Sequence, residues 1–261
     1  MLIDIGVNFT SSNFKLDLST VIKHAVDQGI ETMIVTGSDV TDSLEALELC
    51  AQYPQNLKST FGIHPHHADG FSNADLITID QHHTNNFVVA LGECGLDYNR
   101  NYSGKKAQLY CFEAQLEFAC STELPVFLHQ RDAHSDFLGL LKKYRDNLSN
   151  CVVHCFTGTQ QELFDYLELD AHIGITGWIC DERRGHHLHD LLCKIPENRL
   201  MVETDAPYLL PRSLRPKPKS RRNEPKYLPH IVEVIANNVN KDYDTLAFET
   251  TQTAQNFFKL Q

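Results

Sequence analysis

The sequence lacks the features that mark exported, membrane-bound and repetitive proteins. Its first residues, Met1 to Val7, have neither the basic start nor the long apolar centre of a secretory signal, and no apolar run approaches the length of a membrane-spanning helix. There is no low-complexity tract, no internal repeat and no linker dense in glycine, serine or proline. We therefore predict one compact cytoplasmic domain, residues 1–261, that acts as a monomer without contacting a membrane.

Positive charge is scarce. The chain has 23 lysines and arginines against 34 acidic residues, a net charge of −11, which argues against a protein that coats nucleic acid over its whole surface. Six cations nevertheless gather in one proline-rich segment: Arg212, Arg215, Lys217, Lys219, Arg221 and Arg222. This basic segment could be a solvated loop that balances the acidic surface. Because it begins shortly after the acidic residue Asp205, we favour a role in attracting an anionic substrate.

Short apolar runs recur along the chain and predict strands. They cover residues 2–7, 32–36, 57–62, 87–92, 125–129, 151–156, 171–176 and 200–204. Amphipathic stretches separate them, as in the helical spacing of Leu109, Phe112, Leu116 and Ala119. Alternating strands and helices predict an α/β fold with a parallel sheet covered by helices, and eight such units predict closure into a TIM-like (β/α)8 barrel. An open, doubly wound sheet is the alternative.

Two further patterns concern helices outside the predicted site. Asp42 and Glu45 resemble a capping pair that opens a helix. The stretch from Glu224 to Phe258 predicts two helices separated near residues 238–242, which we interpret as scaffold. The apolar face of the first of these helices would pack on the barrel wall and consists of Leu228, Ile231, Val232 and Ile235.

Several predicted strands lead into a residue that can hold a metal ion or move a proton. These residues are His64, Glu93, His129, His154 and Asp205. Side chains at the C-terminal ends of parallel strands converge in a β/α barrel, so residues far apart in the sequence can form one hydrolytic metal site. A single histidine at a strand end is commonly structural. Two histidines at equivalent places in consecutive units favour metal binding instead.

The acidic candidates need a partner that offsets their charge. Glu93 closes an apolar strand, where burying an unpaired carboxylate is costly. A salt bridge to Arg131 or Arg100 would offset that cost, but we favour a bound cation. Glu203 and Asp205 share one side of the last strand, and only one of them needs to face the centre. We choose Asp205 because it lies nearer the loop.

Histidines and cysteines near these candidates have more than one interpretation. His64 and His66 could bind metal, donate hydrogen bonds to a phosphate or cap the loop; we predict a phosphate contact for His64 and leave His66 and His67 open. Cys94 and Cys155 directly follow two candidate ligands. Because neighbouring residues of a strand point to opposite faces, we expect both thiols to pack against the helices. No cysteines form a Cys-x-x-Cys pair, so reduced thiols are expected.

Together, several motifs resemble those of the TatD family of metal-dependent hydrolases and nucleases. They are Gly62-Ile-His-Pro-His66, Gly92-Glu-Cys-Gly-Leu-Asp97, the strand 125–129 with Arg131-Asp132-Ala133, His154-Cys-Phe-Thr-Gly158 and Glu203-Thr-Asp-Ala-Pro-Tyr-Leu209. The motifs follow the family's order over nearly the whole chain. The resemblance implies a TIM-like barrel, a divalent-metal site at its C-terminal face and exonucleolytic hydrolysis of phosphodiester bonds.

The first strand departs from the commonest pattern of that family. Many relatives carry a His-x-His pair there, whereas this chain has Gly6 and Asn8. Gly6 cannot coordinate through a side chain, and Asn8 offers only a neutral oxygen, which argues against a tightly bound two-metal centre. The pattern resembles the branch that contains TatD itself, which implies 3′–5′ exonuclease activity, dependent on Mg²⁺, on single-stranded DNA and RNA.

These observations lead to a hypothesis for the chemistry. The predicted ligands of one divalent ion are Glu93, His129, His154 and Asp205. Glu93 and Asp205 are the predicted catalytic residues, with Asp205 orienting or deprotonating the attacking water. The predicted substrate-binding residues are His64, Arg131, Arg221 and Arg222. The resemblance favours Mg²⁺, although two histidine ligands would equally suit Mn²⁺ or Zn²⁺.

Two other functions are compatible with the same residues. One is an amide or ester hydrolase, such as an aminoacyl-linkage deacylase, because metal-activated water serves both chemistries. The other is a non-catalytic subunit that binds nucleic acid or protein. Stacking of unpaired bases on Phe156, Trp178 or Tyr208 would explain a preference for single strands, although each ring could equally belong to the barrel wall.

Overall fold

The protein folds as a parallel barrel. The computed structural model describes residues 1–260; residue 261, the last of the predicted domain, lies outside the described residues. Within residues 1–260, eight strands form one sheet in sequence order, and every neighbouring pair is parallel. The strands are β1 (Leu2–Val7), β2 (Ile30–Val35), β3 (Leu57–Phe61), β4 (Val88–Asp97), β5 (Val126–Arg131), β6 (Cys151–Val153), β7 (His172–Ile175) and β8 (Leu200–Val202).

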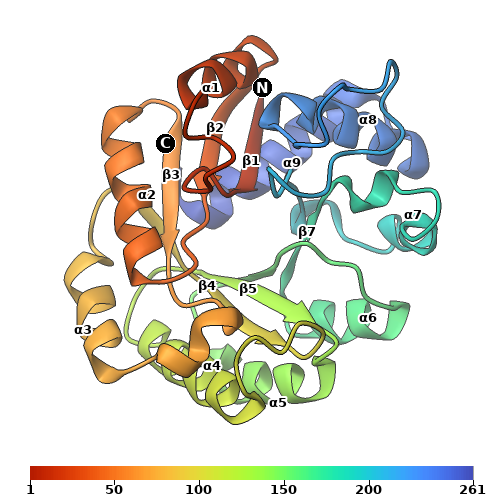
Figure 1. Cartoon of the computed structure of the whole chain (residues 1–261). Helices are drawn as coiled ribbons and strands as arrows, with labels where there is room; N and C mark the ends of the chain where they lie inside the picture. The colour runs from red at the N-terminus through yellow and green to blue at the C-terminus, as the bar shows by residue number, and fades with distance from the viewer. Residues whose placement is uncertain (261) are drawn as a thin grey trace.

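Helices surround the strands, as Figure 1 shows. They are α1 (Leu18–Asp27), α2 (Val40–Gln52), α3 (Asn73–His82), α4 (Lys105–Ala119), α5 (His134–Tyr144), α6 (Gln160–Glu168), α7 (His186–Leu192), α8 (Leu228–Val239) and α9 (Tyr243–Phe258). Short 3-10 helices include η1 (Pro65–Gly70) and η3 (Gly177–Cys180). None of the helices described within residues 1–260 is both long enough and apolar enough to cross a membrane.

Contacts between the first and last strands bring the edges of the sheet together. Val7 forms a parallel bridge with Ala206, and the Asn8 backbone N–H donates to the Ala206 carbonyl at 2.7 Å. The Asp205 N–H donates to the Gly6 carbonyl at 2.9 Å. The TIM-like barrel predicted from the sequence is therefore confirmed, and the alternative of an open, doubly wound sheet is wrong. Closure brings all the C-terminal strand ends to one mouth.

The opposite end of the barrel is filled by α9. Its residues Ala254, Phe257 and Phe258 are buried in one apolar cluster with the barrel interior. The interior residues of that cluster are Ile3, Ile5, Ile34, Val89, Ala90, Phe127, Val152 and Met201. Thr251 also donates its hydroxyl to the carbonyl of Met1, just before β1, at 3.0 Å. Helix α9 therefore closes the N-terminal end of the barrel.

The predicted scaffold helices are confirmed, whereas several local boundaries differ from the prediction. In α4, Phe112, Leu116 and Ala119 are buried, and α8 and α9 are separated at residues 240–242. The cap of α2 is not the pair Asp42 and Glu45: the helix begins earlier, and the Asp39 carboxylate accepts the Asp42 N–H at 2.8 Å. Strand β4 continues to Asp97 instead of ending at Gly92.

Candidate metal centre

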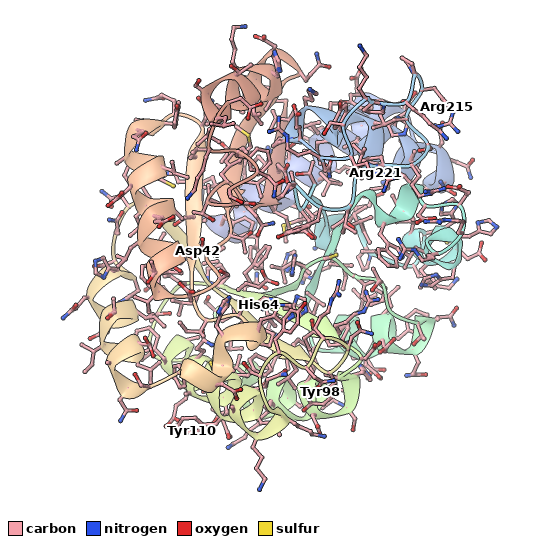
Figure 2. All side chains as sticks on the ribbon, in the orientation of Figure 1. Asp42, His64, Tyr98, Tyr110, Arg215 and Arg221 are labelled. Carbon is pink, nitrogen blue, oxygen red and sulfur yellow. The ribbon has the colours of Figure 1, made fainter. Side chains whose placement is uncertain are left out.

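The candidate ligands lie on different strands but reach one mouth of the barrel. Glu93 lies in β4 and His129 in β5, while His154 follows β6, Asp205 follows β8 and His64 follows β3. Because the sheet is parallel, all five positions face the same end. Figure 2 shows His64 near the middle of that mouth.

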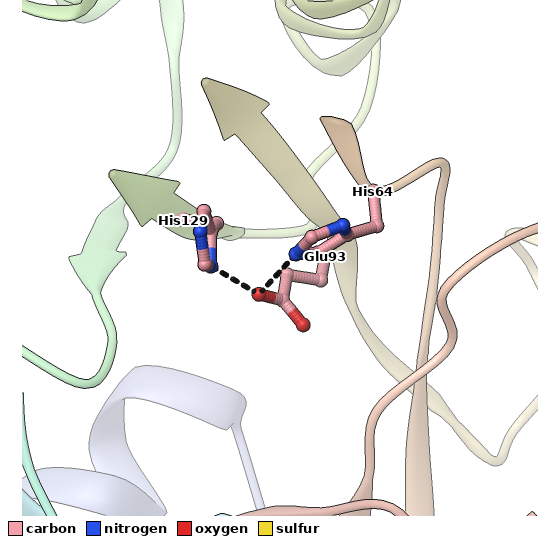
Figure 3. Close-up of side chains that lie close together, drawn as sticks. All are labelled: His64, Glu93 and His129. Carbon is pink, nitrogen blue, oxygen red and sulfur yellow. Dashed lines mark hydrogen bonds and ion pairs between the residues drawn. The ribbon is translucent and has the colours of Figure 1, made fainter. Parts of the chain in front are cut away.

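The carboxylate of Glu93 is the centre of this group. Its Oε1 atom lies 2.8 Å from His129 Nδ1, 2.7 Å from His154 Nε2 and 3.3 Å from His64 Nε2. Figure 3 shows the contacts from His129 and His64. The Glu93 side chain is only 9% exposed. Imidazole nitrogens and a carboxylate oxygen directed at one small buried volume are a donor set that suits a divalent transition metal or Mg²⁺.

Two carboxylates orient the histidines of this set. The second ring nitrogen of His129, Nε2, lies 3.4 Å from Asp97 Oδ2, and Nδ1 of His154 lies 3.3 Å from Glu203 Oε2. A carboxylate at the far nitrogen favours a proton there and leaves the lone pair of the near nitrogen free. Both near nitrogens face Glu93 Oε1. Without a cation each ring lies between two carboxylates, which raises the pKa of both histidines. With a cation bound, the far carboxylate would hold the proton on the far nitrogen and leave the near nitrogen to coordinate.

His64 has the opposite arrangement. The backbone N–H of His66 donates to His64 Nδ1 at 3.0 Å, so the neutral ring carries its proton on Nε2. Burial lowers the pKa of His64 to about 4, even though Glu93 opposes this shift. His64, Glu93 and His129 can offer ligand atoms within 4.8 Å of one another. A protonated nitrogen cannot coordinate, so the geometry favours His64 as a hydrogen-bond donor.

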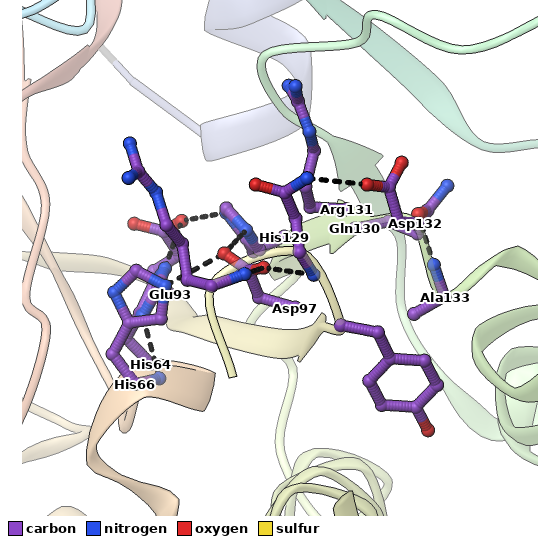
Figure 4. A network of polar contacts seen from close by, with 12 residues as sticks. His64, His66, Glu93, Asp97, His129, Gln130, Arg131, Asp132 and Ala133 are labelled. Atoms are coloured by element: carbon purple, nitrogen blue, oxygen red, sulfur yellow. Dashed lines mark hydrogen bonds and ion pairs between the residues drawn. The ribbon is translucent and has the colours of Figure 1, made fainter. Parts of the chain in front are cut away.

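Asp97 and His66 extend the network beneath the histidines. His66 Nε2 lies 2.8 Å from Asp97 Oδ2, and the other Asp97 oxygen accepts the backbone N–H groups of Asn99 and Arg100 at 2.9 and 2.8 Å. Burial would raise the pKa of Asp97, but the hydrogen bonds from His129 and His66 hold it below its ordinary value. Figure 4 shows this network. An ionised Asp97 keeps its partner His129 oriented.

Buried charge shifts the ionisation of the central groups. Burial opposes the charged forms of Glu93 and His154, yet their mutual attraction lowers the pKa of Glu93 and raises that of His154. Asp205 differs: burial raises its pKa to about 7, and although His154 opposes this shift, Glu203 and Glu93 add to it. Its Oδ1 accepts a hydrogen bond from Asn8 Nδ2 at 2.9 Å. Within residues 1–260, no hydrogen bond or ion pair joins Asp205 to the predicted ligands.

Glu203 also belongs to the site, although the sequence interpretation placed only Asp205 there. Its side chain is fully buried and accepts the Cys155 backbone N–H at 2.5 Å. A Cβ atom at Gly6 would lie 2.5 Å from Glu203 Oε2, and one at Gly174 would lie 2.6 Å from Oε1. Both glycines therefore make room for this carboxylate. Glu203 lies against the place where a side chain of residue 6 would project.

The sequence contained signals for the acids that it did not identify. Asp97 lies four positions after Glu93, and Glu203 lies two positions before Asp205, so each pair has the alternating spacing of one strand face. The prediction for Cys155 is wrong: strand β6 ends at Val153, Cys155 has a positive φ of 48°, and its thiol lies 3.8 Å from Thr176 Oγ1. Burial and the nearby Asp205 and Glu203 raise the pKa of this thiol, which disfavours a thiolate nucleophile.

The predicted substrate-binding arginines have different surroundings. Arg131 donates to Thr157 Oγ1 at 3.5 Å, and within residues 1–260 no carboxylate lies within ion-pairing distance of it. Arg222 is bound to Asp17 at 2.7 and 2.9 Å and to Glu224 at 2.9 Å. Arg221 is exposed on the loop shown in Figure 2 and makes no ion pair with the described residues. Arg222 therefore anchors the basic segment.

The aromatic candidates also differ in exposure. Phe156 is 4% exposed and belongs to the core between strands and helices, whereas Tyr208 is 57% exposed. Trp178 is half-buried in η3 and lies between these extremes. Cys94 is buried close to Cys111 of α4, as predicted. Of these three rings, Trp178 and Tyr208 are exposed enough to contact a ligand, whereas Phe156 is not.

Comparison with known protein families agrees with this geometry. Residues 3–259 match the family described as TatD related DNase. The chain belongs to this family. Among curated relatives, the 3′-5′ ssDNA/RNA exonuclease TatD of Erwinia tasmaniensis is 48% identical over 99% of this chain and 100% of its own length. A protein of the same name from Dickeya dadantii is 48% identical over 99% of this chain and 98% of its own length.

Solved structures of the TatD family share the fold. The hydrolase TatD family protein of Entamoeba histolytica superposes with a TM-score of 0.88 at 27% identity, covering 98% of this chain and 97% of that one. The TatD homologue YJJV of Escherichia coli K12 superposes with a TM-score of 0.88 at 26% identity, covering 100% and 98%. The resemblance to the TatD family seen in the sequence is confirmed.

Proposed function

We propose that this chain is a metal-dependent 3′–5′ exonuclease that hydrolyses phosphodiester bonds of single-stranded DNA and RNA. The observation that carries the proposal is the convergence of His129 Nδ1 and His154 Nε2 on one oxygen of Glu93 at the barrel mouth. Relatives named as 3′-5′ ssDNA/RNA exonucleases, matched along almost their entire length, support the substrate and polarity. The reaction belongs to a single hydrolase domain, residues 1–261, which we propose to be monomeric and cytoplasmic.

Glu93, His129 and His154 are the proposed ligands of one divalent cation, with Asp205 beside them as a further ligand. A bound cation would lower the pKa of water and offset the negative charge that develops on the phosphate oxygens. The carboxylates of Asp97 and Glu203 would keep the two histidines in their coordinating tautomers once the cation is bound. We propose Mg²⁺ as the native ion, with Mn²⁺ or Zn²⁺ as substitutes, because two imidazoles also suit those metals.

Asp205 is the proposed general base. Burial raises the pKa of this carboxylate in the metal-free site, and the Asn8 amide fixes the direction of Oδ1. A bound cation would oppose that shift and keep the carboxylate ionised, so that it can accept a proton from water. The water oxygen then forms a bond to phosphorus, the bond from phosphorus to the leaving oxygen breaks, and that oxygen takes up a proton. Glu93 holds the centre of the site together during this exchange.

Neutral and cationic donors would hold the substrate. His64 can donate its Nε2 proton to a phosphate oxygen, because Nδ1 is already occupied by the His66 N–H. Arg131 has no carboxylate partner among the described residues and can pair with a phosphate. In the basic segment we assign this role to Arg221 and not to Arg222, which is bound to Asp17 and Glu224.

Product analysis on end-labelled oligonucleotides tests this function. We expect a single strand labelled at its 5′ end to shorten stepwise from the 3′ end with Mg²⁺ or Mn²⁺ present, and to remain intact in EDTA. Asp205→Ala should abolish shortening while keeping the native circular dichroism spectrum. Hydrolysis of an aminoacyl ester or amide panel with intact oligonucleotides would contradict the nuclease proposal and favour the other hydrolase class.

A further inference from the structure

A hollow lies at the same end of the barrel as the candidate metal centre. It has a volume of about 240 Å³ and lies between the loop after β5, the loop after β6 and the segment that joins η3 to α7. Arg131, Phe156, Trp178 and Arg184 contribute to its walls, as does Val153, which directly precedes His154. We call this hollow the Trp178 pocket. Arg131 and Phe156 lie two positions after His129 and His154, so the pocket opens at the same end of the barrel as the candidate ligands.

The flat groups of the pocket are stacked on one another. The Arg184 guanidinium carbon lies 4.3 Å from the centroid of the Trp178 ring, and that of Arg131 lies 5.3 Å from it. Trp178 Nε1–H donates to the Arg184 carbonyl at 3.4 Å, which fixes the ring relative to this loop. Nucleobases stack on aromatic rings and on guanidinium planes, and the same guanidinium groups can pair with phosphates.

One cation of the pocket is free to contact a phosphate. Its two acidic wall residues are engaged elsewhere: Glu162 accepts the Thr159 N–H at 2.6 Å, and Asp132 accepts Asn99 Nδ2 at 2.8 Å. Arg184 shares Asp181 with Arg183, whereas Arg131 has no carboxylate partner within residues 1–260. The formal charges of these four wall residues cancel, so the group left to bind an anion is the unpaired Arg131 guanidinium, which lies beside an aromatic ring.

We propose that the Trp178 pocket binds one unpaired base of the substrate, from the nucleotide adjoining the scissile phosphate, with Arg131 and Arg184 contacting its phosphate. This inference rests on the proposed nuclease function and adds a specificity site to it. A base inside a duplex is paired and stacked between its neighbours, so it cannot enter the pocket without being extruded. The pocket thus supplies a physical reason for single-strand preference.

The tryptophan provides a direct binding assay, because Trp178 is the only tryptophan of the chain. With EDTA present to prevent turnover, a single-stranded oligodeoxynucleotide should quench the intrinsic tryptophan fluorescence in a saturable manner. A blunt duplex of the same sequence should quench it much less. An oligonucleotide with abasic sugars in its last positions should also quench weakly, because it offers phosphates but no base to stack.

Adjacent arginines provide a matched pair of variants. Arg183 and Arg184 are about equally exposed and both pair with Asp181, but only Arg184 lies over the Trp178 ring and lines the pocket. Arg184→Ala should raise KM for single strands, while Arg183→Ala should leave it near the wild-type value. Trp178→Ala should raise KM by roughly 5- to 100-fold, the range expected for losing one base stack, and Trp178→Phe should restore most of the affinity.

The outcomes separate this inference from the proposed function. The pocket assignment is overturned, and the nuclease stands, if wild-type enzyme shortens single strands but base-containing and abasic oligonucleotides quench its fluorescence equally. Wild-type KM values in Arg184→Ala and Trp178→Ala would have the same meaning. Equal losses in Arg183→Ala and Arg184→Ala would also overturn it, because they would indicate nonspecific charge. Saturable quenching without any hydrolysis would support the pocket while contradicting the nuclease activity.

Discussion

The two ends of the barrel are built for opposite purposes. At the N-terminal end, Phe257 and Phe258 from α9 pack against an apolar interior. At the C-terminal mouth, the buried groups are the imidazoles and carboxylates around Glu93. Burying apolar side chains stabilises the fold, whereas burying charged groups costs free energy unless partners offset the cost. The comparison indicates that the apolar end stabilises the fold, whereas the polar mouth carries the functional groups at a cost in stability.

Removing an aromatic ring from the apolar end should give the largest effect on stability. Phe257 is 3% exposed, whereas Phe248 on the same helix is 65% exposed. Phe257→Ala should lower the free energy of unfolding by about 3 to 5 kcal/mol because it leaves a cavity, and Phe248→Ala should change it by less than about 0.5 kcal/mol. Urea unfolding measures both. Equal losses would remove the distinction between a closed end and an exposed surface.

Acid should weaken the apolar end through His172. The ring lies 4.8 Å from Phe257 between centroids, and burial, aided by Arg199, lowers the pKa of His172 to about 4. The folded state keeps this ring neutral while the unfolded state binds a proton below its ordinary value of 6.5, so the contribution is complete above that pH and is lost as the pH falls towards 4.

The size of this effect can be measured by comparison with one variant. Between pH 7 and 4.5, wild-type protein should lose roughly 2 to 3 kcal/mol of unfolding free energy that His172→Gln does not lose. Both proteins share the remaining titrating groups, including Asp170 and Arg145 near this ring. Parallel pH profiles would show that His172 does not couple to folding.

At the mouth, Asp97→Asn should reduce activity with little effect on the fold. An amide N–H facing His129 Nε2 would favour a proton on Nδ1, the nitrogen that faces Glu93. We expect a 10- to 100-fold fall in metal affinity or kcat/KM, the range known for outer partners of metal ligands.

A similar pair elsewhere in the molecule provides the control for this variant. His134 Nε2 and Asp165 Oδ2 lie 2.8 Å apart, compared with 3.4 Å for His129 Nε2 and Asp97 Oδ2, but they join α5 to α6 away from the candidate ligands. Asp165→Asn should therefore leave kcat/KM near the wild-type value. If the two substitutions have the same effect, the orienting role of Asp97 is wrong.

The smallest effect concerns the basic segment. Arg221→Ala should weaken binding of single strands and reduce the slope of log K against log salt by about one, because one phosphate contact releases its counterion. Arg222→Ala should instead lower stability, since Arg222 binds Asp17 and Glu224, and should leave the slope unchanged. Filter binding over a salt series in EDTA tests both. A steeper or unchanged slope for Arg221→Ala would return this residue to the solvated surface.

Local patterns in the sequence predicted most of the barrel but less of its mouth. Apolar runs located all eight strands because a buried strand consists of a few consecutive apolar residues, which a local pattern reveals. Glu93, His129 and His154 were identifiable because each directly follows an apolar run in the sequence. The pairing of Arg222 with Asp17, 205 positions away, has no local signal, so the basic segment was assigned too many free cations.

Backbone geometry explains the other differences. Alternation along a strand placed Cys155 among the helices, but β6 ends at Val153 and the positive φ of Cys155 breaks the alternation. The role of Glu203 depends on the space left by Gly6 and Gly174, which lie on two other strands. These contacts between strands form only when the barrel closes, so the sequence of one strand does not predict them.

Metal binding by two histidine variants tests the centre most directly. Titration of metal-free protein with Mn²⁺, followed by electron paramagnetic resonance, should show that His154→Gln lowers affinity by at least about 100-fold, beyond the loss for an outer partner. His64→Gln should bind Mn²⁺ nearly as well as wild-type protein, because its Nε2 carries a proton. Loss of binding in His64→Gln with retention in His154→Gln would contradict a cation held by Glu93, His129 and His154.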